Sequence, residues 1–415
     1  LVHHLRRIGE HARDRSQQVI LVGGCVRDLL LEQRNLDMDV VVVGNAVEFA
    51  QSLQEKHGGE LVHFAQFHTA RWVVEGLKID FSSARIEHYA EVAALPKVEL
   101  AGLTNDLYRR DFSMNALAID LLPERFLQVQ DFFGGYQDLK ARRIRIMHPF
   151  SFMEDPTRLY RAIRFAARFS FELAEETRRA FDLAIERGVV AKLSYKRLGA
   201  EISRCFHEEK AYRALEMLFD SGLLKFLHRD LSRASLLPSR FRLIPGIVRR
   251  FQVLKEEIDS EAVFWAGLLS PLTPDQAEEL LVSMGQPGER RDAAVAALRG
   301  WRTLPVQLAR LAPDDDVGLY DALIPFPLAA LVALVAFTLD KHAVRRVFDF
   351  LGRLRPIRLA ISGKDLIAVG IPTGPMMGRV LRGVLRERIA GGVLTAAEQI
   401  ARARELCQCY STEPA

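Results

Sequence analysis

Two aspartates separated by one residue stand at the start of an apolar segment, in the run Leu36-Asp-Met-Asp-Val-Val-Val. Side chains two residues apart on a β-strand project from the same face, so Asp37 and Asp39 would present two carboxylates together. Two such carboxylates repel each other, and a bound cation relieves that repulsion. Hard oxygen ligands of this kind suit Mg²⁺. The spacing therefore predicts a magnesium site, with a solvated strand edge as the simpler interpretation.

A strand–glycine–helix pattern precedes the aspartates. Val19–Val22 is typical of a short buried strand, and Cys25–Leu31 is typical of a helix. Between them, Gly23 and Gly24 would let backbone N–H groups approach phosphate oxygens, and a helix N-terminus favours negative charge. A Gly-Gly turn is a weak signal by itself. Together with Arg27 and the aspartate pair, it indicates a triphosphate bridged to the protein by Mg²⁺.

A third polar pattern follows later in the chain, on a segment with helical spacing. Asp155, Arg158, Arg161 and Arg164 recur every three residues and would form one stripe along a helix. Pro156 suits the first turn of such a helix, where acidic residues are also favourable. Taken alone, these residues are equally typical of a salt-bridged helix that faces solvent.

These patterns resemble the motifs of a known family. Gly-Gly-x-Val-Arg-Asp-x-Leu-Leu followed by Asp-x-Asp is similar to the signature of class II tRNA nucleotidyltransferases and bacterial poly(A) polymerases, in the polymerase-β-like superfamily. Arg109-Arg-Asp-Phe-Ser-Met-Asn-Ala is similar to the family's second motif, from which it departs at Ser113 and Met114. Glu154-Asp-Pro-Thr-Arg resembles the start of its base-reading helix. The resemblance covers nearly the whole chain, and its motifs are strongest up to Phe169.

The resemblance implies a two-metal reaction. Asp37 and Asp39 would hold two Mg²⁺ ions, one activating the 3′-hydroxyl of the primer and the other neutralising the triphosphate. The superfamily often has a third carboxylate on a neighbouring strand, and Asp80 is the candidate here.

The resemblance also implies a nucleotide-binding set. Arg110 and Asp111 would bind the incoming nucleotide with support from Asn115, while Asp155 and Arg158 would hydrogen-bond the base edge of ATP or CTP. Arginine suits this task because it presents planar donors in a fixed arrangement. The full expected set is Gly23, Gly24, Arg27, Arg110, Asp111, Asn115, Asp155, Arg158, Arg161 and Arg164.

The expected fold is α+β, with a small mixed-sheet polymerase-β-like head followed by an elongated all-α neck, body and tail. Besides Val19–Val22, strands are predicted at Asp39–Val43, Thr69–Val74 and Leu77–Phe81, and the pattern is almost wholly helical from Thr104 onward. The expected divisions are a catalytic head at 1–140, a neck with the base-reading helix at 141–220, a body at 221–340 and a tRNA-binding tail at 341–415.

The implied function is addition of nucleotides to the tRNA 3′ end without a nucleic-acid template, to complete or repair CCA. The terminal A would come from ATP, with or without C from CTP, and the tRNA would be held at its acceptor stem and elbow. The loop Ala84–Leu100 is not shortened, which argues against an enzyme that adds only CC. Bacterial poly(A) polymerase is the alternative, although no basic extension ends the chain. A non-catalytic tRNA-binding module is a more remote one, because both the aspartates and the glycine turn are intact.

Composition and charge agree with this reading. The chain has 415 residues, a formal net charge of +4 and four scattered cysteines, which we interpret as reduced thiols of a cytoplasmic protein. The apolar stretch Leu323–Leu339 is short and interrupted by proline, so we expect a buried helix and not a membrane span. The chain begins at Leu1 and not at Met, as a fragment of a longer polypeptide would.

Overall fold

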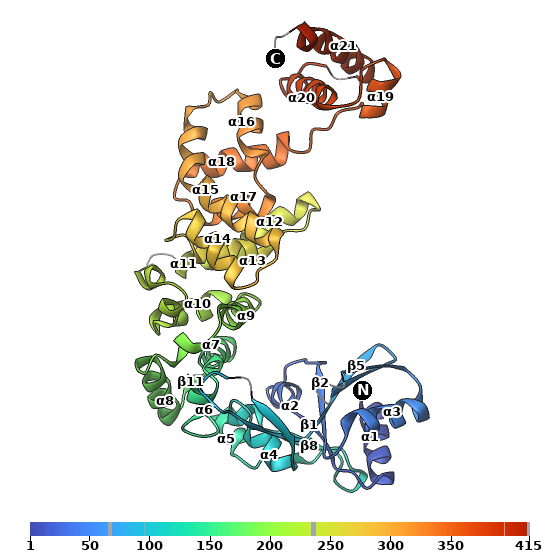
Figure 1. The fold of residues 1–415 in the computed structure, drawn as a ribbon, viewed down its shortest axis with the longest axis vertical. Helices are drawn as coiled ribbons and strands as arrows, with labels where there is room; N and C mark the ends of the chain where they lie inside the picture. Colours follow the sequence, from blue (N-terminus) through green and yellow to red (C-terminus); the bar gives the residue numbers. More distant parts are fainter. Residues whose placement is uncertain (65–68, 95, 234–237, 394, 413–415) are drawn as a thin grey trace. The chain divides into compact units, whose positions relative to one another are not determined.

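The computed structural model describes residues 1–64, 69–94, 96–233, 238–393 and 395–412. The chain folds into two compact units, Leu1–Arg229 and Asp230–Ala415 (Figure 1). The first unit contains a mixed β-sheet followed by helices, and the described part of the second unit is helical. The predicted α+β class is therefore confirmed.

A seven-stranded sheet organises the first unit, in the order β3-β4-β5-β2-β1-β8-β9. Strands β2 and β5 run parallel and the other neighbouring pairs are antiparallel. The strands are β1 (Val19–Val22), β2 (Met38–Val42), β3 (Glu60–Phe64), β4 (Thr69–Val74), β5 (Leu77–Ser83), β8 (Ala118–Asp120) and β9 (Val129–Gln130).

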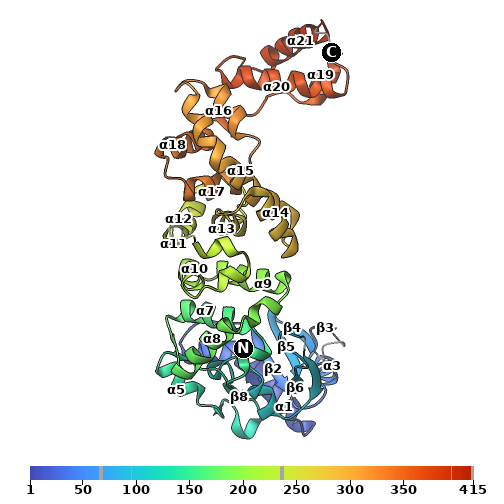
Figure 2. The same ribbon diagram turned by 60° about the vertical axis from the view of Figure 1, so that its left-hand side comes forward.

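Helices α1 (Val2–Asp14) and α3 (Ala46–His57) pack against this sheet (Figures 1 and 2). Helix α3 begins after Asn45, whose side-chain oxygen accepts hydrogen bonds from the first turn. The ring of Phe49 on α3 lies 5.7 Å from that of Phe81 on β5, and both are buried. Alternate residues of β5 join this core, so the opposite face of the strand can carry polar side chains such as Asp80.

The rest of the first unit is mainly helical. Helix α7 packs against α9 and α10, and the Tyr160 hydroxyl donates to the Leu223 carbonyl over 3.1 Å. The helices are α2 (Gly24–Leu30), α4 (Leu103–Tyr108), α5 (Gly135–Lys140), α6 (Ser151–Glu154), α7 (Thr157–Phe169), α8 (Glu175–Glu186), α9 (Tyr195–Phe206) and α10 (Ala211–Asp220). Two small sheets pair β6 (Arg85–His88) with β7 (Lys97–Leu100), and β10 (Arg143–Ile144) with β11 (Glu172–Leu173).

The described part of the second unit consists of packed helices. Those helices are α11 (Pro238–Phe241), α12 (Ile244–Phe251), α13 (Ser260–Leu268), α14 (Pro274–Ser283), α15 (Gly288–Arg310), α16 (Asp316–Leu323), α17 (Leu328–Phe337), α18 (Lys341–Asp349), α19 (Gly363–Ala368), α20 (Pro375–Ile389) and α21 (Ala396–Thr412). Both views show α19, α20 and α21 gathered together, and they share a core that includes Leu366, Val380 and Ala403 (Figures 1 and 2).

Helix α17 accounts for the most apolar stretch of the sequence. All of its residues are buried, and it packs against α13 and α15, so the predicted buried helix is confirmed. In the described part of the chain, no single helix has the length and apolar composition to cross a membrane. Helices α16 and α17 meet that criterion only as a pair bent by 103°.

The predictions of secondary structure fail mainly where a strand pairs with another strand that is distant in sequence. The predicted strand Thr69–Val74 is confirmed with the same bounds. The prediction of almost wholly helical structure after Thr104 is wrong at β8, which pairs with β1 inside the main sheet. The loop Ala84–Leu100 contains the β6–β7 hairpin, while Leu95 within it lies outside the described residues. The division into head, neck, body and tail stays a prediction.

Candidate active site

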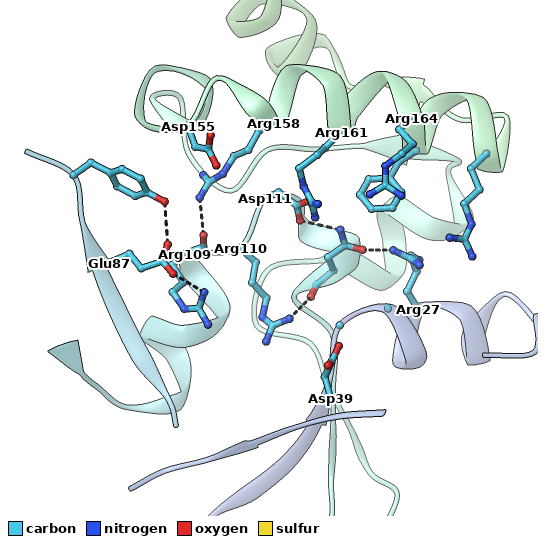
Figure 3. A pocket seen from close by; sticks show the side chains of 16 residues that line it. Arg27, Asp39, Glu87, Arg109, Arg110, Asp111, Asp155, Arg158, Arg161 and Arg164 are labelled. Carbon is cyan, nitrogen blue, oxygen red and sulfur yellow. Dashed lines mark hydrogen bonds and ion pairs between the residues drawn. The ribbon is translucent and has the colours of Figure 1, made fainter. Parts of the chain in front are cut away.

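A polar cavity of about 450 Å³ lies beside α7 in the first unit (Figure 3). The helix runs along one side of it, and the turn before α2 and strand β2 lie on the opposite side. Seven arginines and four acidic residues contribute to its wall. The lining residues are Gly23, Gly24, Arg27, Asp39, Glu87, Tyr89, Arg109, Arg110, Asp111, Asn115, Asp155, Arg158, Arg161, Arg164, Phe165 and Arg168.

The polar stripe predicted on α7 faces this cavity. Asp155, Arg158, Arg161 and Arg164 all line it; the three arginines belong to α7, whereas Asp155 lies between α6 and α7, just before the helix (Figure 3). The opposite face of α7 is apolar and buried, for example at Leu159. The amphipathic pattern therefore fixes which side of the helix the charged residues occupy. The alternative of a stripe facing open solvent is wrong.

Gly23 lets the chain pass close to two charged side chains. Its φ of +77° is a conformation that residues with a Cβ rarely adopt. A Cβ at this position would lie 2.9 Å from Nη1 of Arg110 and 3.8 Å from Oδ2 of Asp39. The glycine turn predicted from the sequence thus lies close to both the Asp39 carboxylate and the Arg110 guanidinium.

Arg27 is a buried cation held in a fixed position. Its guanidinium donates to Oδ1 of Asn115 over 2.6 Å and to Oδ1 of Asp28 over 2.7 Å. It also lies 4.7 Å from the ring centroid of Phe169 and 5.1 Å from that of Phe165, within the range of cation–π attraction. Burial lowers the pKa of Arg27 and Asp28 opposes that shift, so the side chain stays charged. It can therefore offer positive charge to the cavity without rearranging.

Asp111 is engaged by protein groups. Its carboxylate accepts from the Asn115 amide over 2.8 Å and from the Arg161 guanidinium over 2.6 Å. Burial alone would raise the pKa of Asp111, but Arg161, Asn115 and Arg158 together lower it below its usual value. This geometry favours a role in positioning Arg161 and Asn115 at the cavity wall.

We expect Asp111→Asn to destabilise the fold by about 1.5–3 kcal/mol at pH 7, because it removes charge-assisted hydrogen bonds. Since the folded pKa is lowered, the ionised carboxylate stabilises the chain above its unfolded pKa of about 3.9. That contribution is lost as pH falls through the folded value. Urea unfolding at several pH values should show the difference from wild type shrinking in acid. Exposed Asp182 on α8 supplies the control, Asp182→Asn, and equal stabilities at pH 7 would contradict the prediction.

Asp106 anchors the two arginines of the second motif. It is fully buried, and its carboxylate accepts from Arg109 over 2.7 Å and from Arg110 over 3.2 Å. Arg109 also donates to Glu87 over 2.9 Å. Asp106 is not among the residues predicted from the sequence, although its i,i+3 and i,i+4 spacing to the arginines was a usable signal.

The start of α7 is tied to the β6–β7 connection by Arg197. This arginine donates to Oδ1 of Asp155 over 2.8 Å and to the Ala93 carbonyl over 2.8 Å. Arg158 is equally constrained, since it donates to the Ser151 hydroxyl and to the Arg109 carbonyl. Arg197 and the lining residues Glu87, Tyr89, Arg109, Phe165 and Arg168 were not predicted as site residues.

The three predicted catalytic aspartates occupy different positions. The β2–β5 register places Asp39 directly opposite Asp80. Both oxygens of Asp80 accept from Arg71, over 2.6 and 2.7 Å. Asp37 is exposed, directly precedes β2 and lines neither the first cavity nor the second one that follows.

A second cavity, of about 260 Å³, lies on the Asp80 side of Asp39. Asp39 is the residue that it shares with the arginine-lined cavity. The second cavity is lined by Asp39, Thr69, Ala70, Arg71, Asp80, Phe81 and Ser82. Asp39 therefore borders two spaces, one rich in arginine and one in which Arg71 and Asp80 are the other charged residues.

The pKa of Asp39 is raised above its ordinary value. Although the residue is exposed in the cavity, removal of its carboxylate from water by the surrounding protein is the largest cause, and the negative charges of Asp80 and Asp37 raise the pKa further. Arg110 and Arg71 act in the opposite direction. Among the described residues, no three His, Cys, Asp or Glu side chains converge as a ready-made metal site. The carboxylates nonetheless fit a divalent cation, which prefers such oxygen ligands and would relieve the repulsion around Asp39.

The chain is similar to known proteins over most of its length. The chain matches a family model described as the Poly A polymerase head domain over residues 19–145. It matches another, the probable RNA and SrmB-binding site of polymerase A, over residues 170–235. The A-adding tRNA nucleotidyltransferase of Geobacter sulfurreducens is 33% identical over 403 residues, which is 95% of this chain and 46% of that protein.

Solved structures share the fold over almost the whole chain. A CCA-adding enzyme in apo form II has a TM-score of 0.82 and 27% identity, with 97% of this chain and 95% of that chain covered. A Thermotoga maritima CCA-adding enzyme complexed with tRNA_CCA has a TM-score of 0.77 and 28% identity, with 97% and 94% covered. By sequence and by fold, the chain is therefore similar to tRNA nucleotidyltransferases and poly(A) polymerases.

This structural similarity assigns the sheet-containing part to the polymerase-β-like fold, as the sequence predicts. Three curated relatives, all named A-adding tRNA nucleotidyltransferases, are longer than this chain. The chain spans about half the length of those relatives, with 46%, 41% and 51% of them covered.

Proposed function

We propose that this chain adds nucleotides to the 3′ end of tRNA without a nucleic-acid template, completing or repairing CCA. The terminal A would come from ATP, with or without C from CTP. The observation that carries the proposal is the position of Asp39 between an arginine-lined cavity and a second cavity on the Asp80 side. Transfer of a nucleotide requires a donor and an acceptor to meet at one carboxylate centre, and Asp39 borders a space for each.

Mg²⁺ is the proposed cofactor, with Asp37 and Asp39 as ligands and Asp80 as a third candidate. Two ions are expected from the family resemblance. When bound, they would neutralise the triphosphate and increase the acidity of the acceptor hydroxyl. Asp80 would have to exchange its two hydrogen bonds with Arg71 to join such a site.

The arginine-lined cavity is the proposed nucleotide site. Arg27 and Arg110 lie near the glycine turn, where their fixed charges would stabilise a triphosphate. Asp155 and Arg158 lie at the start of α7, where they would hydrogen-bond the base edge. Because these side chains are held by protein contacts before nucleotide binds, little reorganisation is needed at the moment of reaction.

The second cavity is the proposed place of the acceptor end. Thr69 and Ser82 offer hydroxyl groups there, and Arg71 could contact a backbone phosphate. The tail at 341–415 is proposed to contact the rest of the tRNA, with the basic stretch Gly378–Arg388 near the elbow. A cytoplasmic location would accompany this function.

Poly(A) polymerase is the alternative within the same family, since one matching family model carries that description. The Geobacter sulfurreducens relative, which matches nearly the full length of this chain, is instead an A-adding tRNA nucleotidyltransferase. That name favours tRNA as the acceptor.

The proposal is tested with Mg²⁺, single labelled nucleotides and two tRNAs, one ending at the discriminator base and one ending in CC. Label from CTP on the first and from ATP on the second is expected of a complete CCA-adding enzyme. Label from ATP on the CC-ended tRNA alone is expected of an A-adding enzyme. Long A tracts on unrelated RNA would favour the poly(A) polymerase, and absence of transfer with every substrate would overturn the proposal.

A further inference from the structure

A third cavity of the first unit lies next to the nucleotide cavity, and the mechanism proposed above does not use it. Its volume is about 440 Å³, within the range of small-ligand sites. The two cavities share Glu87, Tyr89, Arg109 and Arg158. The Tyr89 hydroxyl and the Arg109 guanidinium both donate to Glu87, over 2.9 Å each, so this hydrogen-bonded group forms the partition between them.

Three aromatic rings line the cavity besides the shared residues. Tyr108 and His148 lie with ring centroids 5.5 Å apart and planes inclined by 30°, and Phe150 lines the cavity beside them. Tyr108 is 47% exposed and Phe150 is 68% exposed. Burial lowers the pKa of His148, so its ring is neutral near pH 7. The cavity thus offers uncharged ring faces that protein only partly covers.

The two arginines of the cavity are held by protein groups: Arg109 is bonded to Glu87 and Asp106, and Arg158 to the Ser151 hydroxyl and the Arg109 carbonyl. The carboxylate of Glu154 also lines the cavity, 3.3 Å from Nε2 of His148, and its negative charge disfavours an anionic ligand. The chemistry of the cavity therefore suits a flat, uncharged and polar-edged ligand better than a phosphate. Stacking on aromatic side chains is the usual way in which proteins hold unpaired nucleobases.

We propose that this cavity binds an unpaired nucleobase of the RNA acceptor, stacked on Tyr108 and Phe150. The inference rests on the proposed function, because it takes the acceptor to be RNA with a single-stranded 3′ end. The last unpaired residues of that RNA must come close to the nucleotide cavity for transfer to occur. The neighbouring cavity is a recess where one of their bases can unstack, and Asn105 offers its edge a hydrogen-bonding amide.

The test compares binding of two tRNAs to the full chain, one ending in CC and one lacking its unpaired 3′ residues. Phe150→Ala and Tyr108→Ala should each weaken binding of the CC-ended tRNA roughly 5- to 100-fold, as expected for loss of one base–aromatic stack. Binding of the shortened tRNA should stay at the wild-type level. Phe150→Tyr keeps the ring and should bind like wild type. Phe132→Ala removes a ring that is 51% exposed and lies outside the cavity, and serves as the matched control.

Each contrary result has a distinct meaning. If wild type transfers nucleotides and both alanine variants bind the CC-ended tRNA normally, the inference is wrong and the proposed function stands. If wild type neither transfers nucleotides nor binds tRNA, the proposed function itself fails. Equal weakening toward both tRNAs would also overturn the inference. So would calorimetry showing two bound ATP molecules in wild type and one in Phe150→Ala, because the occupant would then be a mononucleotide.

Discussion

Asp39→Ala is expected to lower the rate of nucleotide transfer by at least about a thousandfold while tRNA affinity stays close to that of wild type. Asp39 borders both the proposed nucleotide cavity and the proposed acceptor cavity, where its carboxylate would act on the reacting groups. It contributes little surface for holding a whole tRNA. A large loss of nucleotide transfer without a loss of tRNA binding is expected of a residue that acts in the chemical step.

Single-turnover transfer and a tRNA filter-binding assay would be measured on the same preparations over a range of Mg²⁺ concentrations. Asp37→Ala is expected to behave like Asp39→Ala, although Asp37 is exposed and lines neither cavity. Retained transfer by both variants at saturating Mg²⁺ would show that the metal assignment is wrong. A loss confined to Asp39→Ala would move the second ligand role from Asp37 toward Asp80.

Arg158→Ala is expected to reduce selectivity among nucleotides by about 10- to 100-fold, the range associated with losing one well-oriented base contact. Arg158 lines the nucleotide cavity beside Asp155 and is held by Ser151 and the Arg109 carbonyl, so its guanidinium direction is fixed. Selectivity is measured as the ratio of kcat/KM for ATP to that for each other nucleotide on CC-ended tRNA.

Arg158→Lys separates charge from shape in this experiment. Lysine keeps the positive charge and loses the planar donor fork, so selectivity should fall nearly as far as in the alanine variant. Arg179→Ala removes an arginine of α8 that is 75% exposed and controls for loss of a positive charge. The melting temperatures of the variants show whether a loss of selectivity is caused by loss of folding. Unchanged selectivity in both Arg158 variants would place base reading on another residue.

The residues proposed to bind nucleotide could be predicted to lie together largely because most of them occur in short, regular patterns. The ten predicted nucleotide-binding residues all line one cavity. Their individual roles stay predictions, and Asp111 illustrates why. Its type and motif suggest contact with nucleotide, whereas the structure shows its carboxylate bonded to Arg161, fifty residues away in sequence, and to Asn115. A sequence motif gives the type and position of a residue, but it does not show which other residue its charged group will bond.

The sequence by itself determined the features that depend on local spacing. The strand–glycine–helix turn at Gly23 and the polar stripe of α7 follow from backbone freedom and helical periodicity over a few residues. Tertiary structure alone decided that Asp80 faces Asp39, since this depends on the pairing of β2 with β5. It also decided that Asp39 borders two cavities. Strand register and side-chain packing bring together residues that are distant in sequence. The periodicity of a short segment does not determine which of these residues will be in contact.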